Sequence, residues 1–174
     1  MSEGRTLRLK RIGIAFLALL AAAQFIPASR TNPTFDSGGS IWAIATVSPD
    51  ASAILQRSCQ DCHSNRTKWP WYSHVAPVSW VVANDVNVGR NHFNADEWGS
   101  YSLEGKQTKL SKICDELKSG GMPDSKYTLI HRSAKLSPQQ RTVLCDWAEA
   151  TRASLDKVKS AGSVNAKPKD MTHP

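Results

Sequence analysis

Apolar positions along this chain recur with the three- and four-residue spacing of helices, and no stretch keeps the two-residue alternation of a strand. The clearest pattern lies in residues 106–118, where four apolar side chains would share one helix face: Leu110, Ile113, Cys114 and Leu117. Gly120 and Gly121 follow, and glycine is the usual residue at the end of a helix. The pattern therefore predicts an all-α fold.

Three more helices are predicted by their start signals and stripes. Residues 137–140, Ser-Pro-Gln-Gln, match a capping box with proline at the first helical position, and predict a helix that continues to about residue 158. Ser48-Pro49 is a similar start, for a helix that carries Ile54 and Leu55 on one face and leads to Cys59. Valines on one side of residues 78–92 predict another helix.

The N-terminal segment reads as a targeting sequence. The apolar run 12–26 follows four basic residues: Arg5, Arg8, Lys10 and Arg11. The run is shorter than the roughly 20 residues of a membrane-spanning helix and suits the core of a signal peptide. We expect residues 1–29 to be a signal peptide or an uncleaved N-terminal membrane anchor. Either one would place the remainder on the periplasmic side of a bacterial membrane.

The other boundaries follow from composition. Residues 30–47 are rich in turn residues and read as a linker, and 48–158 as one helical domain. Within it, Pro70 and Pro77 exclude a single helix over 64–77, which we expect to be a packed loop, and 121–129 reads as irregular. Residues 159–174 are polar, and we expect a disordered tail there.

Charge adds little to this picture. The formal net charge is +7, but without residues 1–29 it is 18 basic against 14 acidic groups, or +4. The basic residues form no face interleaved with aromatics, so we do not expect nucleic acid as a partner. A weak positive charge suits an acidic redox partner and is equally explained by a solvated surface.

Residues 59–63, Cys-Gln-Asp-Cys-His, match the motif of c-type haem attachment. Thiols one helical turn apart can each add to a haem vinyl group, and the next residue then lies under the iron. A neutral imidazole from His63 would be the proximal iron ligand. The sequence therefore predicts one covalent haem c, with Cys59 and Cys62 as the attachment residues.

Three other interpretations of this motif fit the sequence less well than haem attachment. A zinc site needs four ligands, and Cys114 and Cys145 stand too far apart along the chain to form a second pair. A thioredoxin-like dithiol belongs to a strand-to-helix turn, and no strands are predicted. A structural disulfide within the motif would close a strained, short loop.

Met122 is the expected second iron ligand. It stands in Gly120-Gly-Met-Pro123, a non-helical segment that proline stiffens, and methionine opposite histidine raises the reduction potential. Most methionines only fill gaps in a core, and His74, His92 and His131 are competing ligands. Met171 lies in the expected tail and is set aside.

A longer set of residues resembles a known family. The block 59–73 reads Cys-x-x-Cys-His-Ser-Asn-x-Thr-x-Trp-Pro-Trp-Tyr-Ser, and 76–80 reads Ala-Pro-Val-Ser-Trp. With Gly89-Arg90, Met122-Pro123, Leu136-Ser137 and Trp147, these residues resemble the bacterial haem-binding domain family of small monohaem cytochromes c. The resemblance covers about residues 52–150.

The resemblance implies a cytochrome-c-like helical bundle around one covalent haem, with His63 and Met122 as axial ligands. We expect an aromatic shell at one haem edge, made of Trp69, Trp71, Tyr72 and Trp80. Arg90 is a candidate to hydrogen-bond a propionate. For each of these side chains, plain core packing is an equal alternative.

The sequence thus predicts a monomeric periplasmic electron carrier, without catalysis of its own, for periplasmic or membrane redox proteins. Residues 12–26 are a possible membrane tether. The alternatives are a haem-based gas or redox sensor and a haem subunit of a larger redox enzyme. Cys114 and Cys145 would join the two C-terminal helices if they form a disulfide, which an oxidising compartment favours.

Overall fold

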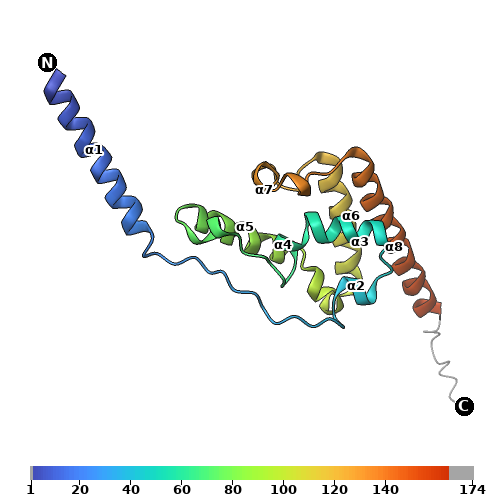
Figure 1. The fold of residues 1–174 in the computed structure, drawn as a ribbon. Helices are drawn as coiled ribbons and strands as arrows, with labels where there is room; N and C mark the ends of the chain where they lie inside the picture. The colour runs from blue at the N-terminus through green and yellow to red at the C-terminus, as the bar shows by residue number, and fades with distance from the viewer. Residues whose placement is uncertain (1, 165–174) are drawn as a thin grey trace, which may run out of the picture.

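The computed structural model describes residues 2–164 and confirms an all-α fold, with no strand in that part of the chain (Figure 1). Its eight α-helices and three 3₁₀ helices are, in chain order, α1 (Ser2–Ala23), α2 (Ile41–Ile44), α3 (Pro49–Ser58), α4 (Gln60–His63), η1 (Trp71–His74), α5 (Val78–His92), η2 (Ala95–Ser100), α6 (Leu103–Ser119), α7 (Ser125–Ile130), η3 (Arg132–Ala134) and α8 (Pro138–Val164).

The predicted helices form where the capping signals place them. The Ser48 hydroxyl accepts a hydrogen bond from Ala51 N at 3.2 Å and so starts α3. At α8 the capping box is complete, because Ser137 Oγ accepts from Gln140 N at 3.2 Å and Gln140 Oε1 accepts from Ser137 N at 3.0 Å. Helix α6 starts at Leu103, ahead of the predicted residue 106, because Ser102 caps it.

The core begins before the predicted boundary at residue 48. Ile41 in α2 is fully buried and packs in the same cluster as Leu55, Trp98, Leu110 and Leu144. The predicted linker 30–47 therefore contributes an apolar side chain to the domain. The turn-rich composition of this segment gave no sign of the burial, because whether one helical turn is buried depends on packing against residues distant in sequence.

Two other segments are more helical than their sequences predict. Helix α7 lies inside the segment 121–129 that reads as irregular, and its cap is the Asp124 side chain, which accepts from Lys126 N. Helix α8 extends to Val164, so residues 159–164 of the expected disordered tail are helical. The rest of that tail, 165–174, lies outside the described residues.

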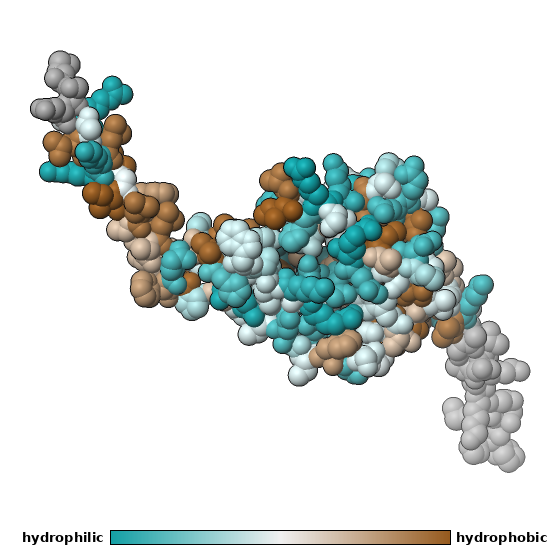
Figure 2. Space-filling model, in the orientation of Figure 1, coloured by the Kyte–Doolittle hydropathy of each residue, from teal (hydrophilic) through white to brown (hydrophobic). Residues whose placement is uncertain are grey.

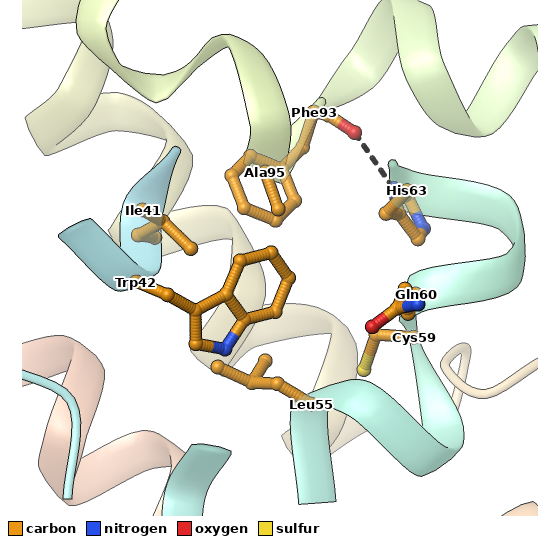
Figure 3. A pocket seen from close by; sticks show the side chains of 8 residues that line it. All are labelled: Ile41, Trp42, Leu55, Cys59, Gln60, His63, Phe93 and Ala95. Atoms are coloured by element: carbon orange, nitrogen blue, oxygen red, sulfur yellow. Dashed lines mark hydrogen bonds between the residues drawn. The ribbon is translucent and has the colours of Figure 1, made fainter. Parts of the chain in front are cut away.

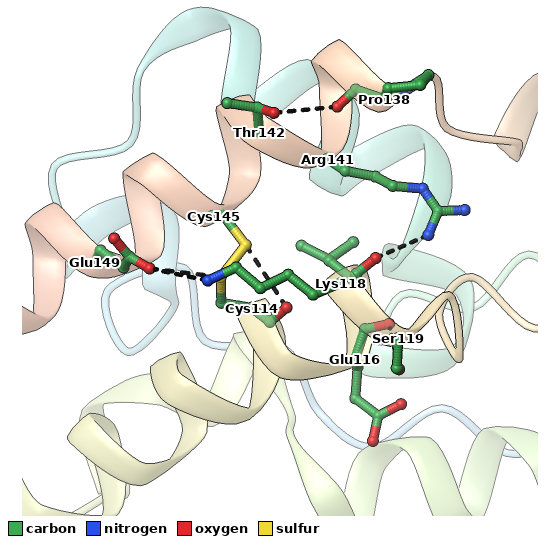
Figure 4. Close-up of a disulfide and its surroundings, with 10 residues drawn as sticks. Cys114, Glu116, Lys118, Ser119, Pro138, Arg141, Thr142, Cys145 and Glu149 are labelled. Carbon is green, nitrogen blue, oxygen red and sulfur yellow. Dashed lines mark hydrogen bonds and ion pairs between the residues drawn. A yellow bond between two sulfur atoms is a disulfide. The ribbon is translucent and has the colours of Figure 1, made fainter.

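Helices α6 and α8 pack side by side along the C-terminal half of the domain (Figure 1). A disulfide joins Cys114 in α6 to Cys145 in α8, which confirms the bond that the sequence left open (Figure 4). At the end of α6, Gly120 has a φ of 77°, the left-handed conformation that favours glycine. Arg141 in α8 donates to the carbonyl of Leu117 at 2.8 Å and satisfies part of this helix end.

Helix α1 projects away from the helical domain, and its apolar side chains are exposed (Figures 1 and 2). In residues 2–164 we find no helix with the length and apolar character needed to traverse a bilayer. The chain after α1 runs in extended form along the domain until α2 (Figure 1).

Candidate functional site

The Cys-x-x-Cys-His motif occupies a tight helical turn. Helix α3 ends at Ser58, and the chain turns at Cys59 into α4, where Cys62 N donates to Cys59 O at 3.2 Å and His63 N donates to the same oxygen at 2.9 Å. The two thiols are not joined to each other or to another cysteine. The motif therefore presents two free thiols and one imidazole within a single turn.

Helix α5 lies directly against this turn, and Gly89 makes the close approach possible. A Cβ atom at Gly89 would lie 2.6 Å from the backbone oxygen of Cys62, a distance that no real side chain tolerates. The absence of a side chain lets α5 pack on α4 and fixes the orientation of the motif.

His63 is held in one orientation by the residue that follows α5. Its Nδ1 lies 3.0 Å from the carbonyl oxygen of Phe93, to which it can only donate, and the two rings are 5.9 Å apart (Figure 3). Burial lowers the pKa of His63, and the bond to Phe93 opposes this effect. The imidazole is therefore neutral near pH 7 and leaves Nε2 as the nitrogen that can meet a metal, the arrangement seen in metal-bound histidines.

Both thiols are kept in their protonated form. Burial, with a smaller contribution from Cys62, raises the pKa of Cys59 to about 12. Burial and then Asp61 raise the pKa of Cys62 to about 11. Zinc binding and disulfide exchange both need the thiolate, so this environment favours neither. Among the described residues, no group of three or more His, Cys, Asp and Glu side chains could hold a metal ion.

A small cavity of about 10 Å³ lies beside the motif (Figure 3). Its lining combines the motif with apolar side chains from α2, α3 and the chain after α5: Ile41, Trp42, Leu55, Cys59, Gln60, His63, Phe93 and Ala95. This volume suits about one water molecule. A porphyrin is far larger, so it would have to lie on another side of the motif.

Helix α7 is bonded both to the motif and to α5. Tyr127 donates to Asp61 Oδ2 at 2.9 Å, and Lys126 pairs with Asp85 of α5 at 3.1 Å. Apolar side chains are exposed along these helices: Val81 and Val88 on α5, and Leu129 and Ile130 on α7. Two thiols, an oriented imidazole and exposed apolar side chains are the groups that a covalently attached haem needs, so the residues fit this cofactor.

Met122 lies in the non-helical segment just before α7, and its place outside a helix is the one that the sequence predicts. Its backbone N–H donates to Glu116 O at 3.3 Å, and its side chain is 38% exposed. A methionine that fills a gap in the core would be buried, so this exposure argues against a purely packing role for Met122. Its role as an iron ligand stays a prediction.

The competing histidine on the same side, His131, is already engaged. Its Nε2 lies 2.5 Å from the hydroxyl of Tyr72, and its ring stacks on Tyr127 with 4.4 Å between the centroids. His74 and His92 are the last residues of η1 and α5, respectively.

The predicted aromatic shell is divided between two places. Tyr72 contacts His131, the residue that follows α7, and Trp71 beside it is exposed. Trp69 and Trp80 instead donate to the segment after α1, to Asn32 Oδ1 at 3.2 Å and to the carbonyl of Ile26 at 3.1 Å, respectively. These bonds tie the two indoles to the N-terminal segment, and their contact with a haem stays a prediction.

Arg90 binds protein groups with most of its guanidinium. It donates to the carbonyls of Ser64 and Thr31, each at 2.9 Å, and to the side chains of Asn32 and Thr67, each at 2.8 Å. In the structure Arg90 thus holds the loop after His63 against the extended segment before α2. A bond from Arg90 to a propionate stays a prediction.

Several residues that shape the site carry no sequence signal of their own. Phe93 acts through its carbonyl, which any residue has, and Trp42 comes from the predicted linker. Asp96 is buried and accepts from Asn65 N and twice from Arg66, which fixes the chain after the motif. Nothing in the sequence pairs Asp96 with Arg66, because the two residues are 30 positions apart and each is one of many charged residues.

Comparison with known proteins agrees with this site. The family model described as a haem-binding domain matches residues 18–150. The chain is also 26% identical over 103 residues to a cytochrome c peroxidase, Ccp, from Escherichia coli (strain K12), which covers 58% of this chain and 22% of the peroxidase. The chain therefore spans about a fifth of that relative's length. No solved structure matches it. The motif, its oriented histidine and the match over most of the chain together show that this protein belongs to the haem-binding domain family.

Proposed function

We propose that this protein is an exported electron carrier with one covalent haem c, held by Cys59 and Cys62, with His63 and Met122 as axial ligands. The observation that carries the proposal is the single turn that presents two free thiols and an imidazole whose Nδ1 bonds Phe93. Haem iron, when bound, supplies a one-electron couple between its ferric and ferrous states.

The protein's own residues attach and orient the cofactor. Each of the free thiols of Cys59 and Cys62 would add its S–H across one vinyl double bond of the haem, which would form one thioether and leave no by-product. His63 offers Nε2 in a fixed direction because Phe93 holds the other ring nitrogen. With Met122 on the other side, both axial positions would be filled, and no open position would remain for substrate.

The proposed compartment is the bacterial periplasm. The disulfide between Cys114 and Cys145 supports it, because such bonds persist in oxidising compartments. Residues 1–29 would direct export, and 12–26 would serve as a tether if the segment is retained. Periplasmic or membrane redox proteins are the proposed partners of a monomeric domain.

A second candidate is a haem subunit of a larger redox enzyme. The similarity to a cytochrome c peroxidase favours it, since this chain corresponds to only a part of that protein. In that case the domain would pass electrons to a catalytic partner. A gas or redox sensor would instead need an axial position that Met122 leaves open.

The test is to purify the full chain from cells with working cytochrome c maturation and record its mass and its pyridine haemochrome spectrum. We expect the mass of one haem added to the polypeptide and a spectrum with both vinyl groups saturated. A colourless protein with the mass of the bare polypeptide would overturn the proposal. Rapid CO binding to the reduced protein would favour the sensor, and slow or absent binding favours the carrier.

A further inference from the structure

The segment that follows α1 is bonded to the domain. The carboxamide of Gln24 pairs with both backbone groups of Ala76, donating to its carbonyl at 3.1 Å and accepting from its N–H at 3.0 Å. Trp80 donates to the carbonyl of Ile26 at 3.1 Å. The end of α1 is therefore fixed against the corner between η1 and α5. A flexible linker, by contrast, would let α1 move relative to the domain.

The bonds continue along the extended chain. Arg30 donates to the carbonyl of Ser73 at 3.2 Å, and Asn32 donates to that of Thr67 at 3.0 Å. Farther along, Asn65 donates to the carbonyl of Thr34 at 3.0 Å. Since these bonds follow one another along the chain, the segment keeps α1 in a set position relative to the domain.

Exposed apolar side chains gather where α1 meets the domain. We name this set the junction face. Its members come from the residues just after α1, from η1 and the residue that follows it, and from the start of α5: Phe25, Ile26, Trp71, Val75 and Val78. Phe25 and Trp71 are 87% and 79% exposed, respectively. Figure 2 shows apolar surface running along α1 towards this end of the domain.

The junction face also lacks charge. Residues 12–29 and 69–84 contain no Asp, Glu, Lys or Arg, although these four types make up 21% of the chain. Two uncharged segments that are distant in sequence are thus brought to one place. Large exposed apolar side chains next to tryptophans are typical of surfaces that sit at a membrane–water interface.

We propose that the junction face lies against the surface of a phospholipid bilayer, in continuity with the apolar part of α1. The inference rests on the proposed attachment through residues 12–26 and adds which face of the domain meets the lipid. Four basic residues at the start of α1 favour anionic phospholipids. Because α1 is bonded to the domain, the haem motif would stay close to the membrane, as suits a partner that is itself membrane-bound.

The experiment uses the full, haem-loaded chain in vesicles of phosphatidylcholine and phosphatidylglycerol, with a photoactivatable group on the lipid near the headgroup. Adducts are mapped to residues by mass spectrometry. We expect adducts on α1 and on η1 and the start of α5, and few on α8, which points away from α1 (Figure 1). Adducts confined to residues 12–23, or equally frequent on α8, would overturn the proposal.

A matched pair of variants separates the bilayer from other occupants of this face. The double variant Phe25→Ser/Val75→Ser should reduce adducts on η1 severalfold and leave the haem spectrum unchanged. Ile44→Ser/Val158→Ser, which changes exposed apolar residues on α2 and α8, away from the haem motif, should leave the lipid adducts unchanged.

Two outcomes would count against specific parts of the argument. If Phe25→Ser/Val75→Ser loses haem attachment, the face belongs to the haem pocket and the lipid proposal is wrong. If the wild-type chain carries no haem but still gives adducts on η1, the proposed electron-transfer function fails while the membrane-facing surface stands.

Discussion

Gly89 of α5 lies so close to Cys62 that a single added methyl group would collide with the Cys62 backbone oxygen, at 2.6 Å. This contact joins the helix behind the motif to the motif itself. The closest atoms of Cys62 in this contact belong to its backbone, so a collision with a side chain at position 89 could not be relieved by a change of rotamer.

We predict that Gly89→Ala destabilises the protein by about 1–3 kcal/mol, as overpacking in a close-packed interior does. Alanine favours a helix by roughly 1 kcal/mol over glycine, but the collision with the Cys62 backbone outweighs that gain. Urea unfolding of the purified protein measures the difference. Gly38→Ala is the control, because a Cβ there would meet only the Asp36 carboxylate at 3.4 Å. Equal stability of the two variants would contradict the prediction.

We predict that removing the disulfide lowers the free energy of unfolding by more than Gly89→Ala does. The bond between Cys114 and Cys145 spans a sequence separation of 31, for which the loss of chain entropy amounts to about 3–4 kcal/mol. We expect Cys114→Ala and the double variant Cys114→Ala/Cys145→Ala to lose nearly the same unfolding free energy, since either one abolishes the bond. A single variant that is clearly more stable than the double variant would show that the thiols are not paired in the purified protein.

The elements that the sequence predicted well are those with local signals. The capping box at Ser137 and Gln140 determines the start of α8 within one helical turn, and the same atoms form it in the structure. Ile41 had no such signal, because its burial depends on α3, α6 and α8 packing around it. Helix α7 was missed for a related reason, since its contacts with Asp61 and Asp85 stabilise a segment of weak intrinsic preference.

Two ion pairs in the structure should behave differently when one partner is removed. Asp96 is fully buried at its side chain and pairs with Arg66 at 2.9 Å, whereas Lys118 and Glu149 are both more than half exposed and lie 3.4 Å apart. Arg66→Met should cost about 2–3 kcal/mol, below the full range for a buried pair because Arg66 is 33% exposed. Lys118→Met should cost less than about 1 kcal/mol.

Thermal or urea unfolding of the two variants tests this contrast. Because Asp96 also accepts from Asn65 N, Arg66→Met should loosen the chain just after His63, visible as faster amide exchange at residues 64–67. Similar losses for both variants would mean that the pair at Asp96 does not hold this loop.

The site was predictable as far as its chemistry is written in adjacent residues. Cys59, Cys62 and His63 are recognisable because their spacing along one turn is itself the requirement. Gly89 entered the sequence analysis only as part of the family pattern, and Phe93 did not enter it, because a carbonyl and a missing side chain act only through the fold. Arg90 illustrates the reverse case: its charge suggested a propionate, and the fold gives it four protein acceptors.

The second axial ligand decides between carrier and sensor, and Met122→Ala tests it. If the Met122 sulfur binds iron, its loss leaves haem attached through Cys59 and Cys62 but lowers the reduction potential, by on the order of 100 mV, because the thioether favours ferrous iron. The long-wavelength absorption band of sulfur-bound ferric haem should vanish, and CO should bind the reduced variant quickly. Val158→Ala, which changes an exposed apolar residue on α8, is the control and should keep the wild-type potential. An unchanged potential in Met122→Ala would assign the position to another residue. His131→Gln would then be the next variant, since freeing that imidazole from Tyr72 is the shortest route to an alternative ligand on the same side.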